Sequence, residues 1–258
     1  MPMRLFAVTV LLLLSTSAAT RLGAQTPVQP APRPDSVRVS ARQAAEYEGL
    51  RTDWAGLQTF MKANADLPAP APDENRVVFM GNSIVELWTP YFASLFPGKP
   101  YIGRGISGQT TPQMLVRFRQ DVIALKPKVV LILAGTNDIA GNTGPATLEM
   151  IENNLASMAE LAKANGIRVV LSAVMPVCDY IKPQTERRPP AKIVALNQWI
   201  RDYTVKNGFV FLDYYSAMVD SNKMLKKELT FDGLHPNAAG YAVMSPLAEK
   251  AIEKALAE

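Results

Sequence analysis

An unbroken apolar run, Val129 to Ala134 (VVLILA), constrains the fold of this chain more than any other feature. A strand that faces water on one side alternates apolar and polar residues. A strand of a parallel sheet is covered on both faces and is apolar throughout. The run therefore predicts a buried central strand of a parallel β-sheet.

Strand-like and helix-like segments alternate around this run. Further strands are predicted at four short segments: Val77–Met80, Tyr101–Gly103, Val169–Ala173 and Phe209–Leu212. Helices are predicted after Ser83, from Thr111, and over Pro145–Ala164, Lys192–Lys206 and Asn237–Leu256. Strands that alternate with helices indicate an α/β fold, in which helices cover both faces of a mainly parallel, five-stranded sheet.

Residues 1–24 have the features of a secretory signal peptide. Arg4 supplies the basic start, Leu5–Leu14 is apolar, and cleavage after Ala19 or after Ala24 fits the small residues that follow. The apolar run is short for a bilayer span, which disfavours the alternative of an uncleaved anchor. We therefore expect a secreted or periplasmic protein with no stable membrane insertion once the signal is removed.

A proline-rich segment follows the predicted signal peptide. Its sequence (QTPVQPAPRP) indicates extended, mobile chain, so residues 25–50 are assigned to a spacer and residues 51–258 to a single domain. Asp53–Ala65 is predicted to be a helix that packs on the outside of this domain, with a partner-binding face as the alternative. That prediction depends on apolar residues at helical spacing: Trp54, Leu57, Phe60 and Met61.

Charge and cysteine content exclude several classes of function. The formal charge is only +4 and the basic residues are scattered, so no nucleic-acid partner is expected. Cys178 is the only cysteine, and a single thiol provides neither an internal disulfide nor a clustered metal site. We expect it to be a small buried residue, and we expect no metal or other cofactor. The non-periodic segment Pro176–Pro190 is predicted to be a surface loop.

Ser83 lies where the first predicted strand gives way to a helix, in the sequence Gly-Asn-Ser-Ile. Chemistry in parallel α/β sheets is found beyond the carboxyl ends of the strands. A serine at such a turn can act as a nucleophile while its backbone N–H donates to an oxyanion. A plain helix N-cap is the alternative for this residue.

Two further clusters lie near predicted strand ends. Gly103–Gly108 matches the dinucleotide pattern G-x-G-x-x-G, but it does not open the first strand–helix unit, and the following Asp121 falls inside a predicted helix. We interpret it as a tight loop whose N–H groups face an anion. In the second cluster, the Asn137 amide could donate to an oxyanion and Asp138 could fix the loop, with simple loop capping as the alternative.

The last cluster is Asp232-Gly-Leu-His235-Pro. A carboxylate three residues before a histidine can accept the Nδ1 proton and leave Nε2 free as a base. His235 is the only histidine of the chain, so no other imidazole competes for this role. Trp88 and Tyr91 follow Ser83 and either pack the first helix or stack on a sugar.

The order of these clusters resembles that of the SGNH/GDSL hydrolase family, from about Val77 to the last helix. The resemblance implies a flavodoxin-like three-layer α/β/α sandwich. It also implies that Ser83 is the nucleophile and that Asp232 and His235 complete a catalytic triad. The N–H groups of Ser83 and Gly108, together with the Asn137 side chain, would form the oxyanion hole.

The chain departs from the family pattern at two positions. The usual Gly-Asp-Ser-Leu is Gly-Asn-Ser-Ile here, and Gln109 stands where an acid often follows the second glycine. Neither change removes a triad or oxyanion group, so the expected chemistry is retained. The chain also has no Gly-x-Ser-x-Gly elbow, which argues against an ordinary α/β-hydrolase.

The resemblance implies an exported serine esterase that hydrolyses carboxylic esters through an acyl-enzyme on Ser83. Short acyl groups such as acetyl, carried on a small molecule or a carbohydrate, are expected. A polysaccharide O-acyltransferase and a lysophospholipase would use the same triad and stay open as alternatives. A non-catalytic carbohydrate-binding domain is disfavoured because every triad residue is present. The oligomeric state is not predicted.

Overall fold

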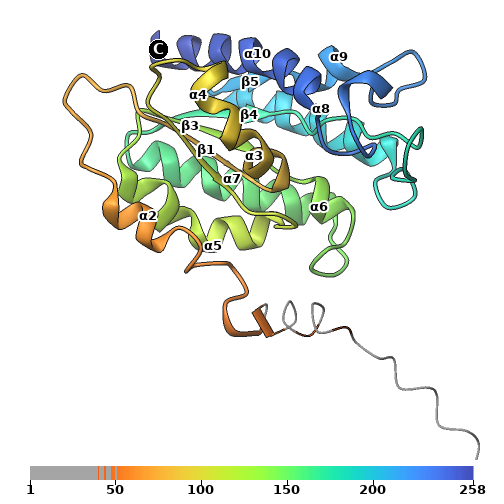
Figure 1. Ribbon diagram of the computed structural model, residues 1–258, viewed down its shortest axis with the longest axis horizontal. Coiled ribbons are helices and arrows are strands. Elements are labelled where there is room, and N and C mark those ends of the chain that lie inside the picture. Colours follow the sequence, from red (N-terminus) through yellow and green to blue (C-terminus); the bar gives the residue numbers. More distant parts are fainter. Residues whose placement is uncertain (1–39, 41–43, 45–47, 50, 258) are drawn as a thin grey trace, which may run out of the picture. The chain divides into compact units, whose positions relative to one another are not determined.

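Five parallel strands form the centre of the protein (Figure 1). The computed structural model describes residues 40, 44, 48, 49 and 51–257. In sheet order the strands are β2 (Tyr101–Gly105), β1 (Val77–Gly81), β3 (Val129–Leu133), β4 (Arg168–Ser172) and β5 (Val210–Leu212). The strand predicted from the apolar run, β3, lies in the middle and is buried along its whole length.

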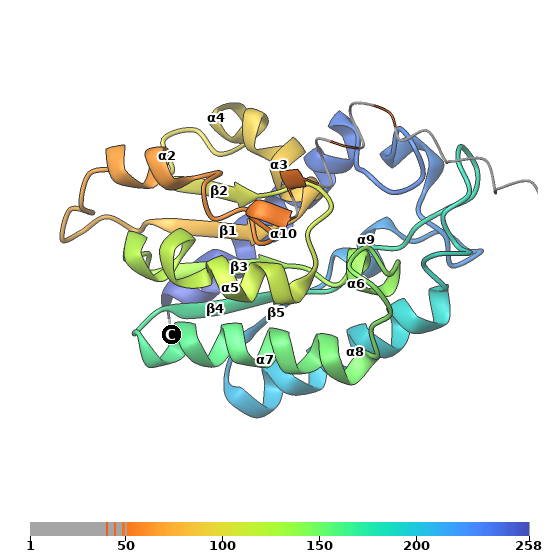
Figure 2. The same ribbon diagram turned by 90° about the horizontal axis from the view of Figure 1, so that it is seen from below.

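Helices cover both faces of this sheet (Figure 2), which confirms the predicted three-layer α/β/α arrangement. One face is covered by α5 (Thr111–Asp121), α7 (Leu148–Ala164) and α8 (Pro190–Asn207). The other is covered by α3 (Ser83–Trp88), α4 (Phe92–Leu95), α9 (Tyr214–Met218) and α10 (Ala238–Ala257). Shorter elements are α2 (Met61–Asp66), α6 (Thr136–Ile139) and the 3-10 helices η1 (Thr89–Tyr91), η2 (Ile123–Leu125) and η3 (Lys227–Leu229).

The two cores follow from the alternation of side chains along each strand. In β3, Leu131 packs with the α3 and α10 core, whereas its neighbours Val130 and Ile132 pack with the α5, α7 and α8 core. Each fully buried aliphatic side chain contributes about 1.5–3 kcal/mol relative to exposure. Because alternate side chains of β3 pack into the two cores, every position of the strand is occupied by an apolar residue.

The segment before the sheet differs from the prediction. Helix α2 covers only Met61–Asp66, and the predicted start at Asp53 is wrong. The Asp53 carboxylate accepts the N–H groups of Leu57 and Gln58 at 2.7 and 2.9 Å, and Gly56 has φ +67°, so the chain turns here instead of forming a helix. Trp54, Leu57 and Met61 are exposed, and therefore this segment does not pack as an amphipathic helix.

One further prediction about burial is corrected, and the alternative left open for Trp88 is decided. The segment 176–190 is not simply a surface loop, because Val177, Cys178 and Arg188 are buried. Trp88 is fully buried and stacks on Tyr241 with a ring separation of 5.5 Å, so it packs the helix and is not available to a sugar. Cys178 is a buried free thiol, as predicted.

Predictions about the N-terminus fall mostly outside the described residues. The signal peptide lies wholly outside them, as does the spacer apart from residues 40, 44, 48 and 49. None of the helices in the described part of the chain is both long and apolar enough to cross a membrane.

Candidate active site

Ser83 is the first residue of α3, directly beyond the carboxyl end of β1. The helix is capped by Asn82, whose Oδ1 accepts the N–H of Ile84 at 3.0 Å, so the N-cap alternative for Ser83 is wrong. The Ser83 residue is only 8% exposed, which makes it less open than a serine at a surface turn. Its hydroxyl is therefore held in one environment rather than free in solvent.

Ser83, His235 and Asp232 form a continuous chain of polar contacts. The Ser83 Oγ lies 2.9 Å from His235 Nε2, and His235 Nδ1 lies 2.8 Å from Asp232 Oδ2. Because the carboxylate faces Nδ1, the Nδ1–H tautomer is favoured and Nε2 is left to accept the serine proton. The structure thus brings together the three residues predicted to form the triad.

The Asp232 carboxylate is also bonded by its own turn. Its Oδ1 accepts the backbone N–H groups of Leu234 and His235 at 3.0 and 2.8 Å. Partial burial raises the pKa of this carboxyl, but the hydrogen bonds from His235 and Leu234 outweigh burial, and the pKa lies below its ordinary value. Asp232 is consequently ionised at neutral pH.

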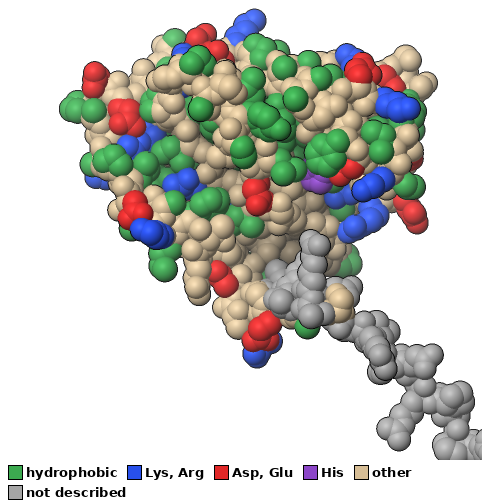
Figure 3. Space-filling view, in the orientation of Figure 1, with side chains coloured by type: hydrophobic (Ala, Val, Ile, Leu, Met, Phe, Trp, Pro, Cys, Tyr) green, Lys and Arg blue, Asp and Glu red, His purple; other side chains and the backbone are tan. Residues whose placement is uncertain are grey.

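Contacts outside the turn fix its position. Gly233 has φ +92°, and a side chain there would collide with the carbonyl oxygen of Cys178. The Cys178 N–H donates to the Gly233 carbonyl at 2.8 Å. The exposed Phe231 ring stacks on the His235 ring with a centroid separation of 5.6 Å. Figure 3 shows that the histidine reaches the molecular surface, beside acidic and basic side chains.

Two of the three predicted oxyanion groups, at Gly108 and Asn137, come from loops that are bonded to each other. Asn137 Nδ2 donates to the carbonyl of Gln109 at 3.0 Å, and Asn142 Nδ2 donates to the carbonyl of Gly108 at 3.0 Å. Gly108 has φ +78°, a backbone conformation that favours glycine. Within the described residues, the N–H groups of Ser83 and Gly108 donate to no protein acceptor, so both remain available to a substrate oxygen.

Asp138 bonds the loop of Asn137 to the start of α5, which follows the loop of Gly108. Its buried carboxylate accepts the N–H and the hydroxyl of Thr111 at 2.9 and 2.6 Å, at the start of α5. Burial raises the pKa of Asp138, and the bonds from Thr111 oppose that shift. Its role is to hold the loop, as the sequence indicated.

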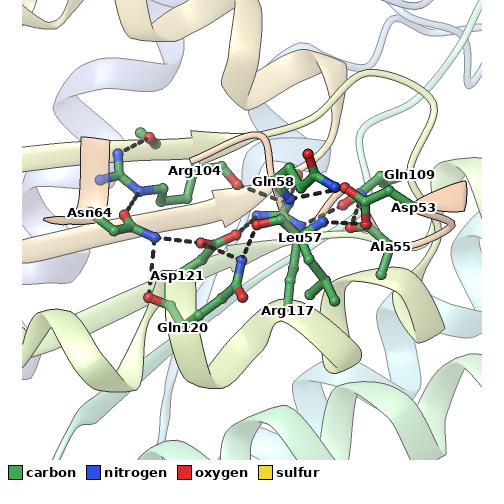
Figure 4. Close-up of polar contacts among 12 residues, drawn as sticks. Asp53, Ala55, Leu57, Gln58, Asn64, Arg104, Gln109, Arg117, Gln120 and Asp121 are labelled. Atoms are coloured by element: carbon green, nitrogen blue, oxygen red, sulfur yellow. Dashed lines mark hydrogen bonds and ion pairs between the residues drawn. The ribbon is translucent and has the colours of Figure 1, made fainter. Parts of the chain in front are cut away.

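Sequence reasoning missed a buried arginine, Arg117, whose polar contacts are drawn in Figure 4. The fully buried Arg117 donates to the carbonyls of Gly81 and Arg104 at 2.9 Å each, at the ends of β1 and β2. It also donates to Gln109 Oε1 at 2.6 Å and pairs with Asp121 at 3.0 Å. Burial lowers the pKa of Arg117 to about 10, so it stays charged at neutral pH. Of these partners only Asp121 lies at the local i,i+4 spacing, and no local sequence pattern identifies the strand-end carbonyls or Gln109.

The N-terminal turn is bonded to the same region through three glutamine side chains. Their amides donate to carbonyls of the turn: Gln113 to Trp54 at 2.6 Å, Gln109 to Ala55 at 2.7 Å and Gln120 to Leu57 at 2.6 Å. The turn lines one side of a pocket of about 430 Å³, which Gly108, Asn142 and Arg187 also line. The N-terminal segment therefore borders the pocket beside Gly108 rather than packing as an outer helix.

Among the described residues, no group of three or more histidine, cysteine or acidic side chains is arranged to hold a metal ion. The Ser83–His235–Asp232 contacts join a hydroxyl, an imidazole and a carboxylate, which are the groups that the sequence predicts as nucleophile, base and acid. Fold and site together define an ester-hydrolysing enzyme of the α/β class.

The chain belongs to the GDSL-like lipase/acylhydrolase family, whose model matches residues 79–243. It is similar to the structure of a candidate acylhydrolase from Bacteroides fragilis, with 48% identity, a TM-score of 0.75, and coverage of 79% of this chain and 99% of that one. A GDSL-like lipase from Bacteroides thetaiotaomicron is 46% identical, with a TM-score of 0.74 and coverage of 78% and 99%.

Two further proteins are similar at lower sequence identity or over a smaller part of the chain. An acetylxylan esterase from Geobacillus stearothermophilus shares the fold at 19% identity, with a TM-score of 0.58 over 72% of this chain and 95% of that one. An uncharacterized lipoprotein of Bacillus subtilis is 33% identical over 81 residues, which is 30% of this chain and about a third of that protein.

Proposed function

We propose that the protein is an exported serine esterase that hydrolyses short-chain carboxylic esters, such as acetyl esters, through an acyl-enzyme on Ser83. The observation that carries the proposal is the contact chain from Ser83 Oγ through His235 to Asp232, at 2.9 and 2.8 Å. Membership of an acylhydrolase family also supports hydrolysis of an ester bond.

In the first half of the reaction, His235 Nε2 accepts the Ser83 proton while Oγ attacks the ester carbonyl carbon. The N–H groups of Ser83 and Gly108 and the Asn137 amide bind the resulting oxyanion. The tetrahedral intermediate collapses as His235 donates its proton to the leaving alcohol, and the acyl group stays on Ser83.

In the second half, water replaces the alcohol. His235 takes a proton from the water molecule, whose oxygen attacks the acyl carbonyl. Collapse of the second intermediate returns the proton to Ser83 Oγ and releases the carboxylic acid. Asp232, kept ionised by the bonds of its turn, stabilises the imidazolium in both halves.

The pocket beside Gly108 supports a compact, polar substrate. Its volume is about 430 Å³, within the range of small-molecule sites, and its wall combines the Trp54 ring with Asn142 and Arg187. An acetyl group on a hydroxyl-rich carrier suits such a wall better than a long alkyl chain. The Geobacillus protein is named for acetylxylan, which makes acetylated xylan a sensible first substrate to assay.

Export is supported by the basic start and apolar run of residues 1–24 and by the lipoprotein relative. Cell fractionation of the full-length protein with an activity assay tests this part. Activity confined to the cytoplasmic fraction would contradict export without affecting the esterase assignment.

A fluorophosphonate probe and an acyl-chain series test the chemistry. The wild-type protein should be labelled, Ser83→Ala should not, and kcat/KM should fall steadily from p-nitrophenyl acetate to laurate. Acetylated xylan and acetylated pectin are assayed beside them. Equal labelling of Ser83→Ala would contradict the nucleophile, and a maximum at long chains would contradict the acyl preference.

A further inference from the structure

Arg188 is a buried cation beside the predicted oxyanion residue. It is 5% exposed, although it lies in a loop that the sequence placed at the surface. Its Nη2 donates to Asn137 Oδ1 at 3.4 Å, and its Nε donates to the hydroxyl of the adjoining Thr136 at 3.2 Å. Two donors of one rigid guanidinium therefore contact successive residues of the loop that presents Asn137.

The partners of this guanidinium are neutral. The third contact is from Nη1 to Gln184 Oε1 at 2.9 Å, and no carboxylate of the described residues forms an ion pair with Arg188. Burial lowers the pKa of Arg188 to about 10, an effect that Arg187 adds to and Asp232 opposes. Arg188 is thus charged at neutral pH, and a buried charge without an ionic partner is costly to keep.

Contact with Oδ1 determines which way the Asn137 amide faces. An asparagine side chain has an acceptor on one side and a donor on the other, and a flip exchanges them. A guanidinium at Oδ1 allows only the orientation in which Nδ2 points away from Arg188, toward the loop that carries Gly108 and Gln109. The adjacent positive charge also polarises the amide, which strengthens Nδ2 as a donor.

We propose that Arg188 is a positioning residue that holds Asn137 as an oxyanion donor and polarises its amide. The proposal rests on the proposed function, because it takes Asn137 to bind the oxyanion. An oxyanion donor acts mainly in the transition state, so loss of Arg188 lowers kcat more than it changes KM. The interaction runs through one side chain, which makes it separable by a double-mutant cycle.

The experiment measures kcat and KM on p-nitrophenyl acetate for four proteins: wild type, Arg188→Met, Asn137→Ala and the double variant. Asn137→Ala should lose about 10²–10³-fold in kcat, as is typical for an oxyanion donor. Arg188→Met should lose about 10–100-fold in kcat with KM changed less than about threefold, and in the Asn137→Ala background it should lose less than about threefold more.

Two results would overturn the proposal. One is a kcat of Arg188→Met within about twofold of wild type, and the other is an equal fold-loss with and without Asn137. Arg168→Met is the matched control, since this exposed arginine lies at the opposite end of β4 and should leave kcat unchanged.

A conservative variant covers the case in which Arg188→Met does not fold, as judged by circular dichroism. Arg188→Lys keeps the charge but lacks the planar fork, so it should show a smaller kcat loss that again disappears in the Asn137→Ala background. Persistence of that loss without Asn137 would contradict the proposal. The proposed function is tested separately, by fluorophosphonate labelling of Ser83. If wild type and Ser83→Ala were labelled equally, the proposed function would fail whatever the Arg188 variants show.

Discussion

The two halves of the candidate active site, the predicted acid–base turn and the predicted oxyanion groups, are built in different ways. The acid–base half needs four consecutive residues, because Asp232 bonds the backbone and the ring of His235 within one turn. The oxyanion half is assembled from the end of β1, the loop at Gly108 and the loop at Asn137, which are far apart in the sequence. A geometry that depends on several segments needs buried polar bonds to hold them, and Arg117 and Asp138 provide these.

This difference predicts two kinds of variant. Changes in the Asp232–His235 turn should abolish chemistry and leave the fold almost intact, because the turn is local. Changes at Arg117 or Asp138 should lower both stability and activity, because their buried hydrogen bonds hold the segments that carry the predicted oxyanion donors. The following variants separate the two behaviours, in order of expected effect.

The largest effect is expected from Asp232→Asn. The amide can still accept the turn N–H groups through its oxygen, but it favours the wrong imidazole tautomer, so kcat should fall by about 10³–10⁴-fold. The melting temperature should change little. Steady-state kinetics and thermal unfolding at pH 7 check this, and a loss below about tenfold would show that the local turn is not the catalytic acid–base half.

The pH dependence of stability provides a second measurement on the same variant. The pKa of Asp232 lies below its ordinary value of 3.8, so its ionised form stabilises the folded state above that value, and the contribution is lost as pH falls through the lower folded pKa. Urea unfolding should therefore separate wild type from Asp232→Asn more at pH 6 than at pH 3. A constant separation would contradict this.

The next effect is expected from Arg117→Met. Removal of the guanidinium leaves Asp121 buried without its ionic partner and frees the carbonyls at the ends of β1 and β2, so we expect a loss of about 3–5 kcal/mol in the free energy of unfolding. The kcat should fall as well, because Arg117 also holds Gln109 beside Gly108.

Lys62→Met is the matched control for this variant. The Lys62–Asp66 pair has the same i,i+4 spacing but is exposed on α2, and exposed pairs contribute at most about 1 kcal/mol. Urea unfolding and kcat are measured for both variants. If Arg117→Met lost activity and kept full stability, the proposed link between fold and oxyanion half would be wrong.

The contrast between a local turn and a site assembled from distant segments also explains what the sequence could predict. The order of strands and helices follows from local patterns, and β3 and α10 lie within one or two residues of their predicted bounds. The contacts of the candidate triad could be predicted because Asp232 and His235 are neighbours in sequence and the chain has one histidine. Arg117 and Arg188 each have one partner four residues away, but their burial also depends on acceptors from distant segments, which the sequence does not identify.

The N-terminal turn was mispredicted for a related reason. Trp54, Leu57 and Met61 recur at helical spacing, but spacing does not reveal that Asp53 will cap its own turn or that distant glutamines will bond the turn's carbonyls. Here tertiary hydrogen bonds outweighed a short amphipathic pattern.

The smallest effect is expected from Gln113→Leu, which removes the bond to the Trp54 carbonyl. One hydrogen bond contributes about 0.5–1.5 kcal/mol, so the global stability should change little, while amide hydrogen exchange of residues 54–58 should become faster. Because this turn lines the pocket but carries no reacting group, KM for acetylated xylan should rise and kcat on ethyl acetate should stay within about threefold of wild type.

Gln198→Leu, on the exposed face of α8, is the control. Unchanged exchange in 54–58 would show that this glutamine does not hold the turn against the pocket beside Gly108.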